Sequence, residues 1–342
     1  MGPTSLLPAR DPRDLVAAVV VSTLAVEAVG ALALWLAWRP ELGGAAALWP
    51  ALFHAVSAFC NAGFSVFHDN LGDHARDLPT LLVVGLLVVL GGIGFFVFED
   101  VRARLLRQRR RLSLHSRLVL GTSAVLLLGA TGLYLLFERE HTLAAMSPPT
   151  RVANALFMAV TPRTAGFNTV DYDRISNASL VLTLALMWIG GSPGSTAGGV
   201  KTTTAALLAL GLWARLRGRS DVAFGNHSVP DVTVQRAVGL AVGAMLILFG
   251  FVFVLLWTEM PRMEARMDRG HFVELVFEAQ SALGTVGLSM GATAELTPVG
   301  RVLVSLLMFL GRVGPLAVLA AMARRGGRRA RFRLGREDVL VG

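Results

Sequence analysis

The chain has 342 residues, of which 54% are hydrophobic and 16% are charged, and its mean hydropathy is +0.60. Such a composition leaves too little polar surface to enclose a water-soluble core, so it excludes a soluble globular protein and predicts a membrane protein. The formal net charge is +9, and 17 of the 32 basic residues lie in three short segments, 102–117, 215–219 and 324–336.

Six windows of the sequence are apolar over roughly the 20 residues that a bilayer core demands. They are 15–38, 79–98, 117–137, 178–212, 233–258 and 299–322. The three basic segments follow the second, fourth and sixth windows, so the positive-inside rule places them on the cytoplasmic side. The N-terminal segment 1–14 is then cytoplasmic too, because the number of spans is even. This topology accounts for the charge, and we expect no nucleic-acid partner. The first window is too long for the apolar part of a cleaved signal peptide.

A shorter segment lies between the two spans of each pair, at 50–60, 152–161 and 272–283, and each is followed by a loop that contains a glycine. We expect re-entrant helices that enter from the extracellular face and aim the negative end of their dipole at a central cavity, which favours a cation. Glycine lets backbone carbonyls face a pore and replace an ion's hydration shell. The predicted cation ligands are the carbonyls of Asn61, Ala62, Gly63, Thr164, Ala165, Gly166, Thr285, Val286 and Gly287.

The distance from each loop glycine to a glycine in the following span also recurs. It is 28 residues from Gly63 to Gly91, and 24 residues in the other two repeats. We therefore predict an all-α polytopic membrane protein built from span, re-entrant pore loop and span units around one ion pore. The expected division is an N-terminal segment 1–14, repeat A at 15–100, a basic loop at 101–116, repeat B at 117–214, a loop at 215–232, repeat C at 233–322 and a basic tail at 323–342. In the alternative interpretation, the glycines serve only tight turns or helix packing.

The fourth window contains a run that cannot continue a helix, because six of its twelve residues are glycine or proline. The run consists of Gly190, Gly191, Ser192, Pro193, Gly194, Ser195, Thr196, Ala197, Gly198, Gly199, Val200 and Lys201. We expect it to break the span at mid-membrane. A phosphate-binding loop is excluded, because Val200 separates the glycine from the lysine. A hinge that merely relieves packing is the alternative.

Arg312 lies inside the last apolar window, where a charge is costly and usually faces water or a partner. Glu27, in the first span, is a candidate partner, and a structural arginine is the alternative interpretation. We expect Glu278 to make local hydrogen bonds and His54 to be structural. Cys60 is the only cysteine, which excludes an internal disulfide, and no nucleophile or acid–base arrangement points to an enzyme.

Four ordered motifs carry a resemblance to a known family. They are the segments 52–65, 160–168, 190–203 and 309–315. The chain resembles the membrane subunit of the Trk/Ktr/HKT potassium-transporter superfamily, in particular its Ktr branch. The resemblance implies potassium uptake across the cytoplasmic membrane of a bacterium, a gate formed by residues 190–201 beneath the filter, and Arg312 as a positive charge near the pore. It also implies a homodimer in the lipid membrane with a cytoplasmic nucleotide-binding regulatory subunit. No cofactor is expected on this chain, and K⁺ is the transported ion.

The family uses four span–loop–span repeats, and this sequence shows three. Residues 1–14 lead directly into a span that resembles the first span of the family's second repeat. The first repeat, where a glycine is associated with potassium and a serine with sodium selectivity, is therefore expected to be missing. Two alternatives stay open: a truncated or non-conducting subunit, and a sodium-permeable cation channel.

Overall fold

The structure, a computed structural model, describes residues 12–108, 111–263 and 269–313, which are almost entirely helical. The α-helices are α1 (Pro12–Leu42), α2 (Leu48–Phe59), α3 (Leu78–Ile93), α4 (Phe95–Leu105), α5 (Leu114–Phe137), α6 (Pro148–Val160), α7 (Asn177–Trp188), α8 (Thr202–Leu216), α9 (Asp231–Met263), α10 (Arg269–Gly284) and α11 (Pro298–Val313). Two 3-10 turns, η1 (Tyr172–Arg174) and η2 (Ala292–Ala294), follow the second and third re-entrant helices. The predicted end of the last span, 314–322, and the basic tail, 323–342, lie outside the described residues.

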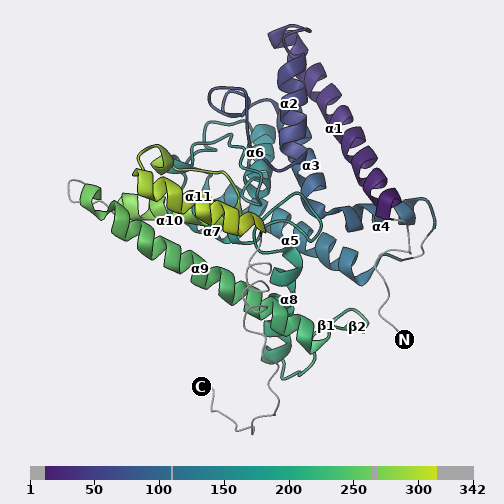
Figure 1. Cartoon of the computed structure of the whole chain (residues 1–342). Coiled ribbons are helices and arrows are strands. Elements are labelled where there is room, and N and C mark those ends of the chain that lie inside the picture. Colours follow the sequence, from purple (N-terminus) through teal and green to yellow (C-terminus); the bar gives the residue numbers. More distant parts are fainter. Residues whose placement is uncertain (1–11, 109–110, 264–268, 314–342) are drawn as a thin grey trace.

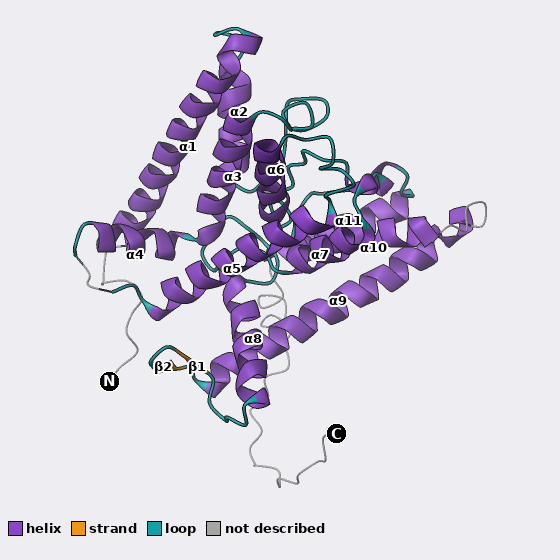
Figure 2. Ribbon diagram, turned by 180° about the vertical axis from the view of Figure 1, so that it is seen from behind, coloured by secondary structure: helices purple, strands orange, loops and turns teal. Residues whose placement is uncertain are grey.

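The helices form three groups that follow one another along the chain (Figure 1). Helices α1, α2 and α3 pack together on one side of the molecule, α9, α10 and α11 on the other, and α5 to α8 lie between them. Figure 2 shows the same order from behind. Adjacent groups are joined in the same way, because α3 packs against the re-entrant helix α6 and α7 packs against the re-entrant helix α10. The repeats therefore share their mode of association as well as their internal pattern.

Three described helices are long and apolar enough to cross a membrane, over Val16–Leu42, Leu114–Phe137 and Asp231–Glu259. Large apolar side chains such as Val125, Leu246 and Phe253 are more than two-thirds exposed on these helices. An apolar exterior on long helices is the arrangement that a bilayer stabilises, since lipid replaces water as the solvent. The fold is that of a polytopic helical membrane protein.

The second apolar window, 79–98, is not one straight span as we predicted. Helix α3 ends at Ile93, and α4 leaves it at an angle of 100°. The junction is Gly94, whose φ of 96° and ψ of 143° are open to glycine alone. A Cβ at this position would also lie 2.6 Å from the carbonyl oxygen of Pro193. The bend brings the start of α4 against the 190–201 run, where the N–H of Phe95 donates to the carbonyl of Gly194 at 3.0 Å.

The loop at 215–232 contains a feature that the sequence did not predict. Strands β1 (Ala223–Phe224) and β2 (His227–Ser228) form a short antiparallel hairpin. The guanidinium of Arg117, at the start of α5, lies 5.7 Å from the ring centroid of Phe224. The hairpin is thereby held against the start of repeat B.

The apolar core lies where the repeats meet. The Phe157 and Phe277 side chains, from α6 and α10, are 2% and 0% exposed and pack against the spans of the preceding repeat. Two pairs of buried polar groups bridge helices in this core: Trp38 Nε1 donates to Thr80 Oγ1 at 2.7 Å, and the hydroxyls of Tyr134 and Thr183 lie 2.7 Å apart. Such pairing is needed because an unpaired polar group in a lipid-embedded core costs several kcal/mol. The re-entrant helices are therefore fixed from outside, and their C-terminal loops meet at the centre.

Candidate functional site

The three glycine loops, loop A (61–64), loop B (164–167) and loop C (285–288), have the same backbone pattern. Two residues before its glycine, each loop holds a non-glycine residue with positive φ: Asn61 at 51°, Thr164 at 74° and Thr285 at 52°. The glycines themselves have φ values of 72°, 80° and 92°. Left-handed residues that alternate with ordinary ones are the backbone arrangement that turns successive carbonyls toward one side. The strain recurs three times, which marks it as a built feature of the loops.

The structure brings the nine predicted ligand residues together at the centre of the molecule. A Cβ on Gly63 would lie 2.4 Å from the carbonyl oxygen of Ala165, and one on Gly166 would lie 2.3 Å from the carbonyl oxygen of Val286. Each carbonyl thus occupies the space that the neighbouring loop's glycine leaves free. Loop B is buried between the other two, whereas Gly287 of loop C is exposed. The loops therefore stand in the order A, B, C around part of a ring.

A hydroxyl residue at the end of each re-entrant helix closes its loop, and sequence reasoning did not assign it a role. Ser57 Oγ donates to the carbonyl of Phe64 at 2.8 Å, and Thr161 Oγ1 donates to the carbonyl of Phe167. In repeat C the backbone N–H of Gly287 donates to Ser281 Oγ at 3.1 Å. The available signal was the recurrence of Ser or Thr at the start of all three aligned segments. These bonds hold the strained glycine turns in place.

Asn70 is a second residue that the sequence analysis missed. Its amide nitrogen lies 3.1 Å from the carbonyl oxygen of Gly63, and its amide oxygen accepts a bond of 3.3 Å from the N–H of Asn168. The backbone N–H of Leu71 donates to the carbonyl of Asn168 at 3.2 Å. The chain after loop A is thus bonded to the chain after loop B. No repeated pattern in the sequence signals this position.

The predicted break in the fourth span is present, between Trp188 and Thr202. The two ends of the 190–201 loop are joined: Gly190 N–H donates to the carbonyl of Val200 at 2.8 Å, and Thr202 N–H donates to the carbonyl of Gly191 at 3.0 Å. Gly194 and Gly199 have φ values of 74° and 66°. The glycines of this run are therefore required by its backbone path, which is a closed loop inside the helix bundle.

Both basic residues of the predicted gate bind carbonyls of this loop. Lys201 Nζ donates to the carbonyl of Ala197 at 2.8 Å, and an Arg312 guanidinium nitrogen donates to the carbonyl of Thr196 at 2.6 Å. The candidate partner Glu27 instead has a carboxylate oxygen 3.8 Å from Cys60 Sγ. Arg312 is exposed, which fits a charge facing the open side of the bundle. The last span and the broken span are thus tied together below the glycine loops.

Two further polar residues behave as the sequence predicts. The buried carboxylate of Glu278 accepts hydrogen bonds from the hydroxyls of Ser289 and Thr293. His54 is buried, and its ring nitrogens lie 2.7 Å from the carbonyl oxygen of Pro50 and 2.8 Å from Ser65 Oγ. Across the residues that the structure describes, no group of three or more His, Cys, Asp or Glu side chains is placed to hold a metal ion.

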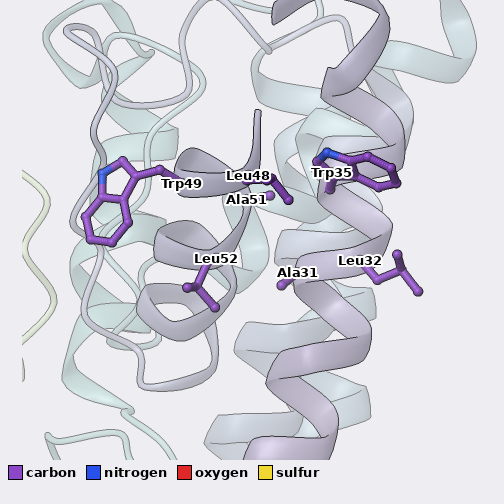
Figure 3. A pocket seen from close by; sticks show the side chains of 7 residues that line it. All are labelled: Ala31, Leu32, Trp35, Leu48, Trp49, Ala51 and Leu52. Carbon is purple, nitrogen blue, oxygen red and sulfur yellow. The ribbon is translucent and has the colours of Figure 1, made fainter. Parts of the chain in front are cut away.

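A pocket of about 580 Å³ lies between α1 and α2, away from these loops (Figure 3). Trp35 and Leu32 of α1 and Leu52 of α2 stand at its edges in this view. It is lined by Ala31, Leu32, Trp35, Leu48, Trp49, Ala51 and Leu52. An apolar lining cannot replace the hydration shell of an ion, so this pocket belongs to the apolar exterior and not to an ion pathway.

Comparison with known proteins places this architecture in a family. The family model TrkH, described as a cation transport protein, matches residues 9–325. The chain belongs to the TrkH family of cation transport proteins. Members of this family are transporters and not enzymes, in agreement with the absence of catalytic motifs in the sequence.

Individual relatives support the TrkH assignment. The chain is 36% identical over 319 residues to the potassium/sodium uptake protein NtpJ of Enterococcus hirae, covering 93% of this chain and 69% of that protein. It is 36% identical over 314 residues to the Ktr system potassium uptake protein B of Bacillus subtilis, covering 91% of this chain and 68% of that protein. The crystal structure of the potassium transporter TrkH from Vibrio parahaemolyticus has the same fold, with a TM-score of 0.74 at 20% identity over 94% of this chain and 67% of that one. The chain spans about two thirds of these relatives.

Proposed function

We propose that this chain mediates potassium uptake across the cytoplasmic membrane, with loops A, B and C as walls of the selectivity filter. The observation that carries the proposal is the threefold recurrence of a left-handed residue and a left-handed glycine in loops that meet at Gly166. A carbonyl ring of this kind replaces the hydration shell of a monovalent cation without any charged ligand. The names of the relatives from Enterococcus hirae and Bacillus subtilis support potassium as the ion.

In this proposal the 190–201 loop is the gate. It lies inside the bundle between the broken halves of the fourth span, and Arg312 and Lys201 hold its carbonyls. The loop and the positive charges of the Lys201 and Arg312 side chains that hold it would together obstruct the passage of a potassium ion. We further propose that a homodimer of this chain binds a separate cytoplasmic nucleotide-binding subunit, which moves the loop. The clusters of basic residues in the loops 101–116 and 215–232 supply the charge for that contact.

Two other functions are favoured by specific observations. The Enterococcus hirae relative is named as a potassium/sodium uptake protein, which favours a cation pathway that also admits sodium. The exposure of Gly287 leaves one side of the loop ring uncovered within the described residues, which favours a chain that conducts only when a further wall is added.

The deciding experiment is cation flux into liposomes that contain the purified protein, measured separately for K⁺ and Na⁺. Flux that prefers K⁺ supports the main proposal, and equal flux of the two ions supports the sodium-permeable pathway. A protein that is inserted and folded but carries neither ion supports the third function. Growth of a potassium-uptake-deficient strain at low K⁺ tests the same activity in cells.

A further inference from the structure

Thr196 lies at the tip of the 190–201 loop and makes hydrogen bonds with three separate parts of the pore. Its hydroxyl oxygen is 2.8 Å from the amide nitrogen of Asn61, which donates to it. The same oxygen lies 3.0 Å from the carbonyl oxygen of Phe59 and 3.1 Å from that of Gly91, either of which accepts its proton. The backbone N–H of Thr196 donates to the carbonyl of Gly91 at 3.3 Å. One residue thus joins the loop to the end of α2, to loop A and to α3.

Asn61, which donates to the Thr196 hydroxyl, is the left-handed residue of loop A. Its side chain is buried, and its φ of 51° is a conformation that a non-glycine residue keeps only when its surroundings hold it. The bond from the amide nitrogen to Thr196 is one of the interactions that hold it. The carbonyls of Asn61 and the two residues after it are proposed filter ligands, so the geometry of Asn61 sets the geometry of one filter wall.

The two carbonyls that Thr196 contacts, those of Phe59 and Gly91, lie where α3 meets the end of α2. Gly91 packs so closely on the end of α2 that a Cβ there would lie 1.9 Å from the carbonyl oxygen of Phe59. If the loop moved away, the Phe59 carbonyl and the Asn61 amide would each lose the hydrogen bond that they make with Thr196, which costs free energy.

Loop C shows a related contact. A Cβ on Gly198 would lie 2.0 Å from Thr285 Oγ1, so the left-handed residue of loop C packs directly on the 190–201 loop. Loops A and C therefore both contact the 190–201 loop through their left-handed residues, Asn61 and Thr285, which occupy equivalent positions in the two repeats.

We infer that Thr196 is a positioning residue that couples the gate to the filter: its hydroxyl holds Asn61, and through Asn61 the shape of loop A, while the gate is closed. The inference rests on the proposed function and adds to it that opening the gate changes the filter. Because coupling between two sites is reciprocal, ions in the filter also bias the position of the gate. Residue 196 therefore influences ion selectivity as well as flux.

The test compares Thr196→Val, which removes the hydroxyl at nearly constant volume, with Thr196→Ser, which keeps it. The matched control is Thr131→Val in α5, where the hydroxyl donates only to the carbonyl of Leu127 in its own helix. Two quantities are measured for each protein: the ratio of K⁺ to Na⁺ flux in liposomes, and the rise in melting temperature that K⁺ produces in detergent. The second measurement reports ion binding without flux.

Thr196→Val is expected to raise flux and to lower the K⁺/Na⁺ ratio by about threefold to tenfold, the effect of one buried hydrogen bond. It should also reduce stabilisation by K⁺, and Thr196→Ser should restore both properties. Raised flux with an unchanged ratio and unchanged K⁺ stabilisation would overturn the coupling and leave the gate intact. A loss of selectivity in Thr131→Val equal to that in Thr196→Val would also overturn it. A folded wild-type protein that neither conducts nor is stabilised by K⁺ would instead reject the proposed function, and the coupling with it.

Discussion

The side-chain amide of Asn70 donates a hydrogen bond of 3.1 Å to the carbonyl oxygen of Gly63. The bond reaches back seven residues, from the segment after loop A to the glycine of loop A. Asn70 itself has a φ of 66°, a left-handed conformation that asparagine tolerates better than most residues. Its amide oxygen accepts from Asn168, so a single side chain fixes loop A relative to loop B.

Replacing Asn70 by glycine should weaken potassium recognition while it preserves the backbone, because glycine also accepts positive φ. We expect the KM for K⁺ to rise about threefold to tenfold, the effect of losing one partly buried hydrogen bond of about 1 kcal/mol. Asn70→Asp keeps the shape but removes the donor, so it should raise the KM as well. An unchanged KM for K⁺ in both variants would show that the Asn70 amide does not set the geometry of Gly63.

Gly166→Ser should reduce discrimination between potassium and sodium. The new Cβ would lie 2.3 Å from the carbonyl oxygen of Val286, and φ at this position is 80°. Strain of about 1–3 kcal/mol in the loop should lower the K⁺/Na⁺ flux ratio by about tenfold or more. The control is Gly132→Ser in α5, where a Cβ meets no atom within 4 Å. If Gly166→Ser supports growth at low K⁺ as well as Gly132→Ser does, with the same ion preference, loop B is not a filter wall.

Deleting residues 193–198 should increase ion flux, because the 190–201 loop is proposed to obstruct the pore. The deletion removes Thr196, the residue whose carbonyl Arg312 binds. Flux into liposomes is the measurement, and a monodisperse profile in detergent is the control for folding. A well-folded deletion protein with less flux than wild type would show that the loop supports the pore and does not gate it.

Gly91→Ala and Gly311→Ala should both destabilise the protein. The added methyl groups would lie 1.9 Å from the carbonyl oxygen of Phe59 and 2.1 Å from that of Leu283. Overpacking of this kind costs about 1–3 kcal/mol. Gly250→Ala in α9 meets no atom within 4 Å and serves as the control. Melting temperatures in detergent should fall for the first two variants and not for the third, and equal values would contradict the close packing.

The stability of repeat B should fall as the pH is lowered, through Glu138 at the end of α5. Burial of this carboxylate would raise its pKa, but bonds donated by Ser179, Ser176 and Thr142 outweigh the burial and lower the pKa below its usual range. A carboxyl with a lowered pKa contributes stability above its unfolded-state pKa and loses it as the pH falls through the folded-state pKa. Glu138→Gln should melt at a temperature that depends less on pH over the acidic range. A wild-type slope identical to the variant's would exclude this contribution.

Much of this architecture could be predicted from the sequence, because a bilayer imposes strong patterns. The re-entrant helices expected at 50–60, 152–161 and 272–283 correspond to α2, α6 and α10, since each is apolar, too short to span and ended by a glycine turn. The break in the fourth span followed equally directly from its six glycines and prolines. These features depend on local chemistry, which a single sequence records.

The features that escaped prediction depend on contacts between distant segments. The bend at Gly94 lies in an apolar window that contains other glycines, and only the approach of Pro193 distinguishes it. The partner of Arg312 is a backbone carbonyl, which no residue type reveals. Asn70 precedes Asn168 by 98 residues, so their bond has no signature in spacing. The hydroxyls of Ser57, Thr161 and Ser281 were visible as a repeat, but their role emerged only from the loop geometry.

The bend after α3 and the break after α7 supply each other's missing hydrogen bonds. The N–H of Phe95 donates to the carbonyl of Gly194 at 3.0 Å, and the N–H of Ser192 donates to the carbonyl of Gly92 at 2.9 Å. Inside a bilayer neither interruption finds water to satisfy its backbone. The backbone of repeat A is therefore completed by a loop that lies about a hundred residues later in the chain, and neither interruption is satisfied without the other.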